Sequence, residues 1–138
     1  MTGQSPAAAF FDTNVLLYLV SSDAAKADRA ETLLADGGVI SVQVLNEFAN
    51  AGRRQAGLSW EEVVDILSLI RRRCRVVGLA AELHDKGVAL ARRFSLSVYD
   101  AMIVAAALEA GSVTLYSEDM QHGLRIDRAL KIVNPFAA

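Results

Sequence analysis

The sequence has little cysteine, proline or histidine: one cysteine, Cys74, two prolines and two histidines in 138 residues. A single cysteine cannot form an internal disulfide, and it suits a reducing cytoplasm. One cysteine and two histidines are too few for a closed zinc site built from four such ligands. A chain of this length can nevertheless bury a sizeable core, so its folding requires neither a disulfide nor a structural metal.

The sequence also lacks an apolar run long enough to span a bilayer, because Asp12 and Asn14 interrupt the only candidate. Lysine and arginine are absent before Lys26, so the N-terminus lacks the charged segment of a secretion signal. We therefore expect neither a membrane anchor nor export.

Positive charge is not in excess, since the formal net charge is −2 and the isoelectric point is about 5.6. This balance gives no indication of nucleic-acid binding across the whole surface. Arginine, which matches the geometry of phosphate, nevertheless clusters at 53–54, 71–75 and 92–93. Such clusters are also typical of solvated helix ends, where cations interact favourably with the helix dipole. The sequence leaves both interpretations open.

The length and the 53% of hydrophobic residues fit one folded domain over 1–138, with 1–6 as a loose tail. Short apolar runs predict strands at 7–11, 39–41, 75–79, 112–116 and 131–133. Apolar periodicity, capping residues and glycines predict helices at 13–20, 23–36, 42–55, 59–73, 80–94 and 98–110. The alternation of strands with helices predicts an α/β fold whose mainly parallel sheet is covered on both faces.

Acidic residues follow two of the predicted strands. Asp12 comes directly after the first strand, and Glu118 and Asp119 come shortly after the fourth. Asp100 lies in the first turn of an otherwise almost wholly apolar helix that leads into the fourth strand. Ligands of open α/β sheets bind beyond the carboxyl ends of the strands. We therefore expect these carboxylates to gather at that edge of the sheet.

Each acidic residue also has a purely structural interpretation. Asp12 is a favoured N-cap for the helix that follows it, and Asp119 suits a polar turn. Ser97 and Asp100 have the spacing of a capping box. Glu47 lies on the flank of its helix, where periodicity favours a solvated surface position. Taken one at a time, these residues leave both interpretations open.

Taken together, several carboxylates at one edge repel one another, and protons or a metal ion are the usual means of neutralisation. Oxygen ligands without histidine or cysteine favour hard cations such as Mg²⁺ or Mn²⁺. A cation held in this way can activate water and neutralise charge that develops on a phosphoryl group. The pattern favours a metal-dependent hydrolase of phosphodiesters without identifying its substrate.

Four stretches of the sequence carry these acidic residues in order: 10–14 (FFDTN), 41–48 (SVQVLNEF), 99–107 (YDAMIVAAA) and 115–123 (LYSEDMQHG). Together they resemble the PIN-domain family, and more narrowly the VapC-type ribonuclease toxins of bacterial toxin–antitoxin pairs. The resemblance extends over nearly the whole chain. None of the four motifs is specific by itself, but their order in a chain of this size is.

The resemblance implies a set of site residues. The acidic positions of the family fall on Asp12, Glu47, Asp100 and Asp119, around one or two Mg²⁺ or Mn²⁺ ions. Asp12 and Asp100 would be the principal metal ligands, with the other two completing the cluster or positioning water. The polar residues that support the cluster would be Thr13, Asn14 and Ser117. Glu118 is a neighbouring carboxylate whose share in the role of Asp119 stays open.

The resemblance also implies a three-layer α/β/α sandwich around a five-stranded parallel sheet, and cleavage of RNA within the chain by metal-activated water. It implies a homodimer in the bacterial cytoplasm and a small antitoxin whose C-terminal segment covers the acidic pocket. Arginines near the pocket would contact RNA phosphates or the antitoxin, and the candidates are Arg53, Arg54, Arg92 and Arg93.

Other interpretations remain at this stage. Aspartyl-phosphate phosphatases of the haloacid dehalogenase group also place an aspartate after the first strand, but Asn14 stands where they have a second aspartate. Lys86 is the only central candidate for the lysine that they need. A degenerate PIN fold used only for binding is another alternative. His122 near Asp119 suggests metal-free acid–base cleavage, although a single histidine in a turn lacks the partners for that chemistry.

Overall fold

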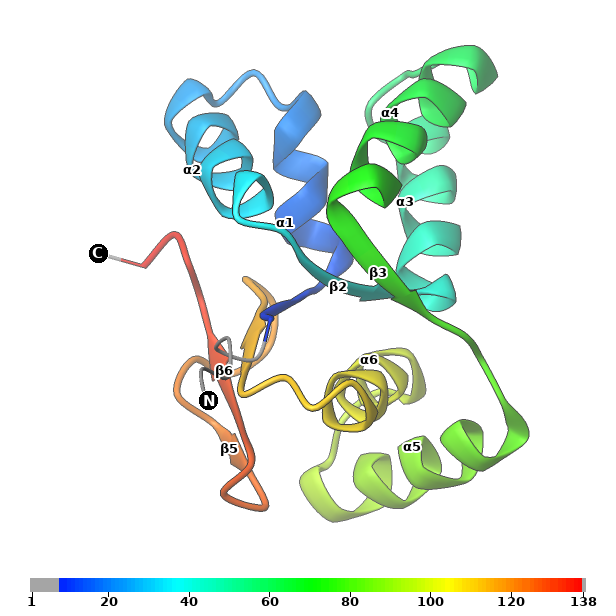
Figure 1. The fold of residues 1–138 in the computed structure, drawn as a ribbon, viewed down its shortest axis with the longest axis vertical. Coiled ribbons are helices and arrows are strands. Elements are labelled where there is room, and N and C mark those ends of the chain that lie inside the picture. The colour runs from blue at the N-terminus through cyan, green and yellow to red at the C-terminus, as the bar shows by residue number, and fades with distance from the viewer. Residues whose placement is uncertain (1–7, 138) are drawn as a thin grey trace, which may run out of the picture.

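A central sheet organises the fold, in the strand order β3-β2-β1-β4-β6-β5. The computed structural model describes residues 8–137, so the tail expected at 1–6 lies outside the described residues. The strands are β1 Phe10–Phe11, β2 Gly38–Ser41, β3 Cys74–Val77, β4 Thr114–Tyr116, β5 Arg125–Ile126 and β6 Leu130–Val133. Figure 1 shows the sheet strongly twisted, with β2 and β3 running across the view and β5 and β6 nearly upright.

Five of these strands run parallel, which confirms the predicted α/β fold. The sixth, β5, pairs antiparallel with β6 at the edge and makes the sheet mixed and six-stranded. The five-stranded sheet that we expected is therefore complete but carries one additional strand. This strand has only two residues, so its sequence offers no apolar run or alternation to detect.

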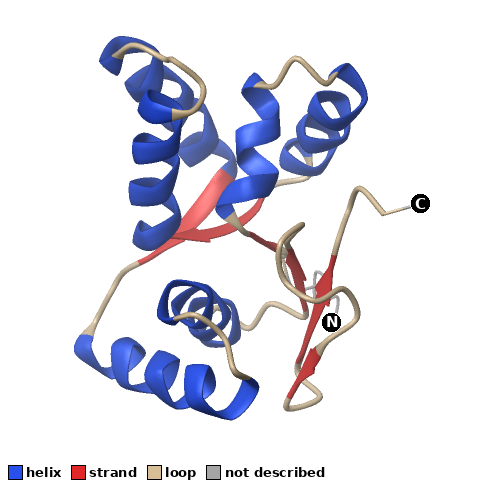
Figure 2. Ribbon diagram, turned by 180° about the vertical axis from the view of Figure 1, so that it is seen from behind, coloured by secondary structure: helices blue, strands red, loops and turns tan. Residues whose placement is uncertain are grey.

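The helices occupy both faces of the sheet. They are α1 Thr13–Leu17, the 3₁₀ turn η1 Tyr18–Val20, α2 Ala24–Ala35, α3 Val42–Arg54, α4 Trp60–Arg73, α5 Ala81–Phe94 and α6 Val98–Glu109. Figures 1 and 2 show α1, α2, α3 and α4 on one side of the sheet and α5 and α6 on the other. The expected three-layer arrangement is therefore present.

Local sequence explains where these helices begin. Ser59 and Glu62 form the capping box predicted at the start of α4, with each side chain bonded to the backbone of the other residue. Helix α6 is apolar around nearly its whole circumference, and residues 101–107 are all buried. A helix of this kind has to lie in the interior, and α6 packs against α5, α3 and β2.

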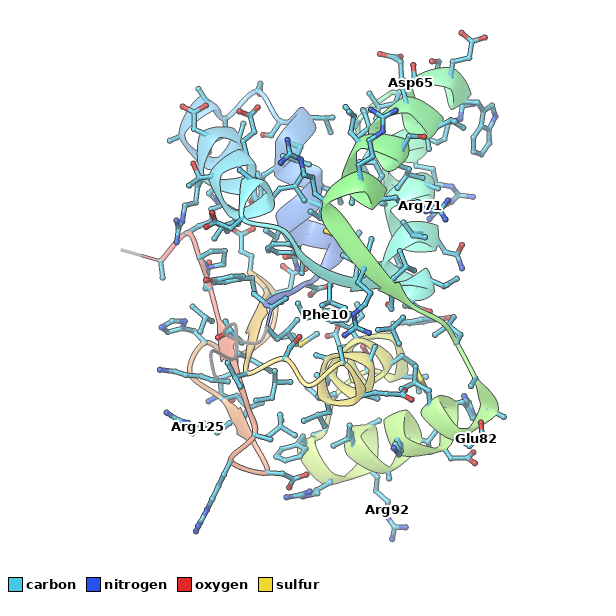
Figure 3. The ribbon with its side chains drawn as sticks, viewed as in Figure 1. Phe10, Asp65, Arg71, Glu82, Arg92 and Arg125 are labelled. Atoms are coloured by element: carbon cyan, nitrogen blue, oxygen red, sulfur yellow. The ribbon has the colours of Figure 1, made fainter. Side chains whose placement is uncertain are left out.

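The core lies around β1 and α6. Phe10, labelled in Figure 3, lies in the middle of the sheet. Phe10 and Phe11 are buried, and they share one hydrophobic cluster with Phe48 of α3 and Ile103 of α6. No helix in the described range 8–137 is both long and apolar enough to cross a membrane.

The order in which the chain adds strands to the sheet reverses at β1. After β1 it adds β2 and β3 on one side, and it then returns through α5 and α6 to add β4 and β6 on the other. The connections that leave β1 and β4 diverge at the carboxyl ends of these two strands. A crevice at such a switch point is the usual ligand site of an open α/β sheet.

Candidate active site

Asp12 lies at this switch point, directly after β1. Its side chain is only 4% exposed and accepts three hydrogen bonds. Thr13 N donates to Oδ1 at 2.7 Å, and Ser117 Oγ and Asn14 Nδ2 donate to Oδ2 at 2.8 and 3.2 Å. Asp12 is also the N-cap of α1. The capping role therefore coexists with a position in the crevice.

The environment of Asp12 disfavours its charge. Burial raises the pKa of this carboxyl from 3.8 to about 7, although hydrogen bonds from Ser117 and Thr13 act in the opposite direction. The negative charges of Asp100 and Glu47 raise the pKa further. A buried carboxylate beside two others is stable in its charged form only when something neutralises it.

Glu47 lies on α3 and turns toward the crevice. Thr13 Oγ1 donates to Oε1 at 2.8 Å, and Gln43 Nε2 donates to Oε2 at 2.6 Å. Periodicity favours the solvated flank of α3 for this residue, but its side chain is partly buried and bonded on both oxygens. The flank of α3 faces the crevice rather than open solvent, which a helical wheel cannot show.

Asp100 lies in the first turn of α6 and is partly buried. Its backbone N–H donates to Ser97 Oγ at 3.1 Å, so Ser97 caps the helix. Burial raises the pKa of the Asp100 carboxyl, and the nearby charges of Glu47 and Asp119 raise it further. The Asp100 carboxylate is thus close enough to Glu47 and Asp119 for their charges to raise its pKa.

One pocket joins the four acidic residues. Asp12, Glu47, Asp100 and Asp119 all line a cavity of about 330 Å³, which we term the acidic pocket. The wall contains further residues from α1, from α3 and from the C-cap of α3, namely Thr13, Asn14, Leu17, Asn50, Ala51 and Gln55. Asp119 comes from the loop after β4 and is exposed. Residues that lie far apart in the sequence therefore meet at the carboxyl edge of the sheet.

Glu118 is bonded to residues outside the acidic pocket. Lys26 Nζ lies 2.7 Å from its Oε2, and Tyr18 Oη donates to its Oε1 at 2.5 Å. Although burial acts to raise the pKa of Glu118, the hydrogen bonds from Lys26 and Tyr18 hold it below its usual value. Glu118 is not among the residues that line the acidic pocket. Its partners therefore separate it from Asp119, its neighbour in sequence.

The acidic pocket fits a divalent cation by its donor chemistry. Its ionisable ligands are carboxylates alone, which favour hard cations. Within residues 8–137, no three His, Cys, Asp or Glu side chains are placed closely enough to form a ready-made metal cluster. Mg²⁺ does not require one, because it keeps several waters and binds through one or two carboxylates. A bound divalent cation would relieve the mutual repulsion of the carboxylates, and this favours its binding.

The candidate arginines lie elsewhere. Arg53 and Arg54 are in the last turn of α3, and Arg92 and Arg93 are in the last turn of α5. None of them lines the acidic pocket. Arg93 pairs with Asp127 at 2.5 Å, and Figure 3 shows Arg92 projecting from α5 away from the sheet. The structure thus places none of the four beside the carboxylates.

Two residues of the alternative interpretations also lie outside the acidic pocket. Lys86 is an exposed residue of α5 and does not line it. His122 accepts a hydrogen bond at Nδ1 from the backbone N–H of Asn134 at 2.9 Å, which connects the loop before β5 to the residue that follows β6. Neither residue is in a position to serve the chemistry for which sequence reasoning considered it.

Sequence reasoning missed three amide residues on α3 and at its C-cap. Gln43 holds Glu47, while Asn50 and Gln55 line the acidic pocket. A helical signal was available, because residues three to four positions apart share one face of a helix. Once Glu47 is placed at the crevice, Gln43 and Asn50 fall on the same face.

Comparison with known proteins agrees with this architecture. The family model described as the PIN domain matches residues 9–125. The chain belongs to the PIN-domain family. No curated protein sequence matches it significantly. The acidic pocket of this PIN domain is formed entirely by residues within the matched range.

Solved structures with the same fold include several from toxin–antitoxin systems. A toxin–antitoxin complex from Klebsiella pneumoniae aligns with a TM-score of 0.72 at 20% identity, covering 94% of this chain and 99% of that one. VapC20 from Mycobacterium tuberculosis, a toxin that cleaves the sarcin–ricin loop, aligns at 0.65 with 22% identity, covering 80% and 89%. VapBC2 from Rickettsia felis, bound to promoter DNA, aligns at 0.65 with 18% identity, covering 90% and 96%.

These identities are low, so the likeness establishes a shared fold. It extends over at least 80% of this chain and 89% of each solved chain.

Proposed function

We propose that this PIN domain is a metal-dependent endoribonuclease and the toxin of a toxin–antitoxin pair. The observation that carries the proposal is the convergence of Asp12, Glu47, Asp100 and Asp119 on one pocket at the switch point of the sheet. Carboxylates gathered without a basic residue in the pocket wall suit a cation. A degenerate PIN fold would have no need to keep four mutually repelling acids together.

We assign the roles from burial and bonding. Asp12 and Asp100 are the principal ligands of Mg²⁺ or Mn²⁺, because burial and neighbouring charges disfavour their ionisation in the absence of a cation. Glu47 and Asp119 complete the charge of the pocket or hold the attacking water. A bound divalent ion lowers the pKa of water and neutralises the charge that develops on the phosphoryl group.

Three polar residues position these carboxylates. Ser117 and Asn14 hold one oxygen of Asp12, while Thr13 holds Glu47 through its hydroxyl. These bonds restrict the rotation of the acidic side chains, so the ligands are oriented before a metal ion or a substrate arrives. They also satisfy carboxylate oxygens that burial removes from water.

The assignment of partners rests on the related structures. Solved proteins with this fold include toxin–antitoxin complexes and a toxin described as cleaving the sarcin–ricin loop. We propose RNA as the substrate, a small antitoxin as the partner, a homodimer as the assembly and the bacterial cytoplasm as the compartment.

The test is cleavage of RNA by the purified chain with Mg²⁺ or Mn²⁺, in excess chelator, and after the metal is restored. We expect cleavage only with metal, and a melting temperature that rises with the metal because a ligand of the folded state stabilises it. Expression in bacterial cells should arrest growth, and Asp12→Asn should relieve the arrest. Undiminished cleavage in excess chelator would refute the mechanism.

A further inference from the structure

A second hollow adjoins the acidic pocket. It has a volume of about 420 Å³ and is lined by Gln43, Asn46, Glu47, Asn50 and Tyr99. Glu47 and Asn50 also line the acidic pocket, so the two cavities are contiguous along α3. We term this second cavity the amide hollow. A ligand whose reacting group lies at the carboxylates would have its neighbouring part in the amide hollow.

Tyr99 forms one wall of the amide hollow. It precedes Asp100 in the first turn of α6, and it is 68% exposed although its ring is large and largely apolar. Among the described residues, Tyr99 forms neither an aromatic pair nor a side-chain hydrogen bond. Its ring is therefore free to stack on a planar ligand directly beside a carboxylate of the acidic pocket.

Two asparagines of α3 also line the amide hollow. Asn46 and Asn50 are four residues apart on α3, so they lie on the same face of the helix, and both are exposed. Neither side chain takes part in a hydrogen bond within the described part of the chain, whereas Gln43 is bonded to Glu47. Each asparagine therefore has an amide donor and an acceptor available for a ligand.

The charge of the amide hollow indicates which part of a nucleic acid it suits. Its lining contains no lysine or arginine, and its one charged residue, Glu47, is negative. A phosphate would be repelled there. A nucleobase is uncharged and planar, and it carries donors and acceptors along its edge, so an aromatic ring with side-chain amides matches it.

We propose that the amide hollow binds one base of an RNA, next to the phosphate at the acidic pocket. Tyr99 stacks on this base, and Asn46 and Asn50 form hydrogen bonds with its edge. The inference rests on the proposed nuclease function and adds a recognition element to it. A base paired within a duplex cannot enter the hollow, so the base beside the cleaved bond has to be unpaired and turned outward.

A mutational cycle between protein and RNA tests this contact. The substrate is a short single-stranded RNA whose cleavage position has been mapped, together with versions that lack the base at each flanking position. With the intact RNA, Tyr99→Ala should lower kcat/KM by about 5- to 150-fold, the range for loss of one stacked base, and Tyr99→Phe should recover most of the loss. On one abasic RNA the same Tyr99→Ala change should have little further effect.

A second exposed aromatic provides the matched control. Trp60 on α4 is 63% exposed and does not line the amide hollow, so Trp60→Ala should cleave the intact RNA at the wild-type rate. Asn46→Ala with Asn50→Ala should reduce the difference in rate between RNAs that differ only in the flanking base. Annealing the RNA to its complement should prevent its cleavage by the wild type.

The outcomes separate this inference from the nuclease function. If the wild type cleaves RNA and Tyr99→Ala cleaves it equally fast, the base contact is overturned and the nuclease function stands. The same conclusion follows if the rate losses from Tyr99→Ala and from removal of the base multiply fully on every abasic RNA. If the wild type cleaves no RNA, the nuclease proposal fails, and binding of the labelled RNA followed by fluorescence anisotropy decides the base contact. Weaker binding by Tyr99→Ala would support the contact, and equal binding or no binding would overturn it.

Discussion

Ser117 Oγ donates a hydrogen bond of 2.8 Å to Asp12 Oδ2, and this bond ties the loop after β4 to the end of β1. The same hydroxyl accepts a hydrogen bond from the backbone N–H of Met120 at 3.2 Å. Ser117 is completely buried, and Asp12 nearly so. One small side chain thus connects the ends of two adjacent strands and orients the carboxylate between them.

Replacing Ser117 should therefore affect both stability and the protonation of Asp12. Ser117→Ala leaves a buried carboxylate oxygen with one donor fewer, at a cost of about 1–3 kcal/mol in the free energy of unfolding. The lost bond normally lowers the pKa of Asp12, so its pKa rises in the variant. If cleavage requires ionised Asp12, the acidic limb of the pH–rate profile shifts to higher pH.

Ser112 offers a matched control for this prediction. It is also buried, but its hydroxyl donates to the carbonyl oxygen of Ala8 at 2.7 Å, at the other end of β4. Ser112→Ala should lower stability without moving the pH–rate profile. An unchanged profile in Ser117→Ala, or an equal shift in both variants, would show that Ser117 does not tune Asp12.

The second prediction concerns stability against pH. Burial raises the pKa of Asp12 from 3.8 in the unfolded chain to about 7 in the folded one. Between these values the folded state binds the extra proton, so the stabilisation present below about pH 4 is lost as the pH rises through about 7. Asp12→Asn removes this dependence. Without metal, the free energy of unfolding of the variant should rise relative to that of the wild type across this pH window, by at most about 4 kcal/mol.

Denaturant unfolding in chelator at about pH 4 and about pH 8 measures this difference. Asp65→Asn, on the exposed face of α4, is the control and should follow the wild-type curve. Parallel curves for Asp12→Asn and the wild type would mean that Asp12 stays ionised in the folded protein throughout this range.

The third prediction separates Glu118 from Asp119. Glu118 is bonded to Lys26 and Tyr18, and this network joins the loop after β4 to α2 and η1. Glu118→Gln should lower the melting temperature by an amount that high salt reduces, because the ion pair is partly exposed. Cleavage should stay within a few-fold of wild type. Asp119→Asn should show the reverse, with slow cleavage and little change in the melting temperature. Comparable losses of cleavage rate in the two variants would contradict separate roles for Glu118 and Asp119.

The fourth prediction concerns two glycines at close approaches. A Cβ on Gly38 would lie 2.4 Å from Phe11 Cε2 and 2.7 Å from the carbonyl oxygen of Ala9, which belongs to the backbone. Gly38→Ala should therefore lower the free energy of unfolding by about 1–3 kcal/mol or more. A Cβ on Gly87 would approach the flexible end of the Met102 side chain most closely, and it would make an ordinary contact of 3.5 Å with the Met102 backbone. Gly87→Ala should change the free energy of unfolding by less than about 1 kcal/mol, because helix propensity offsets the displacement. A loss in Gly38→Ala as small as this would show that β1 and β2 can separate.

The sequence predicts the elements of this fold well where burial is complete. Residues 101–107 of α6 are apolar without interruption, and the run that ends at Phe11 is bounded by a charge, so both signals are clear. The β5–β6 hairpin shows the opposite case. Asp127 and Arg128 both have positive φ, as in the tight turns that join hairpins. Asp127 is a weak turn signal, but without glycine or asparagine there the sequence gives no strong one.

The site shows a similar division. Asp12, Asp100 and Asp119 are predictable because strand ends and helix starts meet at one edge of a parallel sheet. Glu47 is not predictable from periodicity, because a polar side chain facing a crevice has the same spacing as one facing solvent. Only the family resemblance indicates its place. The amides of α3 are missed for the same reason, since their role depends on the angle at which α3 approaches α1.

The metal-binding role of Asp12 and Asp100 is tested by the rate of RNA cleavage against Mg²⁺ or Mn²⁺ concentration for the wild type, Asp12→Asn, Asp100→Asn and Glu109→Gln. Glu109 is the matched control, because it is an exposed acid at the far end of the helix that carries Asp100. We expect metal-dependent cleavage by the wild type and Glu109→Gln, and rates lower by at least about 100-fold in the folded aspartate variants, typical for loss of a catalytic group. Cleavage by Asp12→Asn and Asp100→Asn at the wild-type rate and metal dependence would show that these two aspartates do not hold a catalytic metal ion.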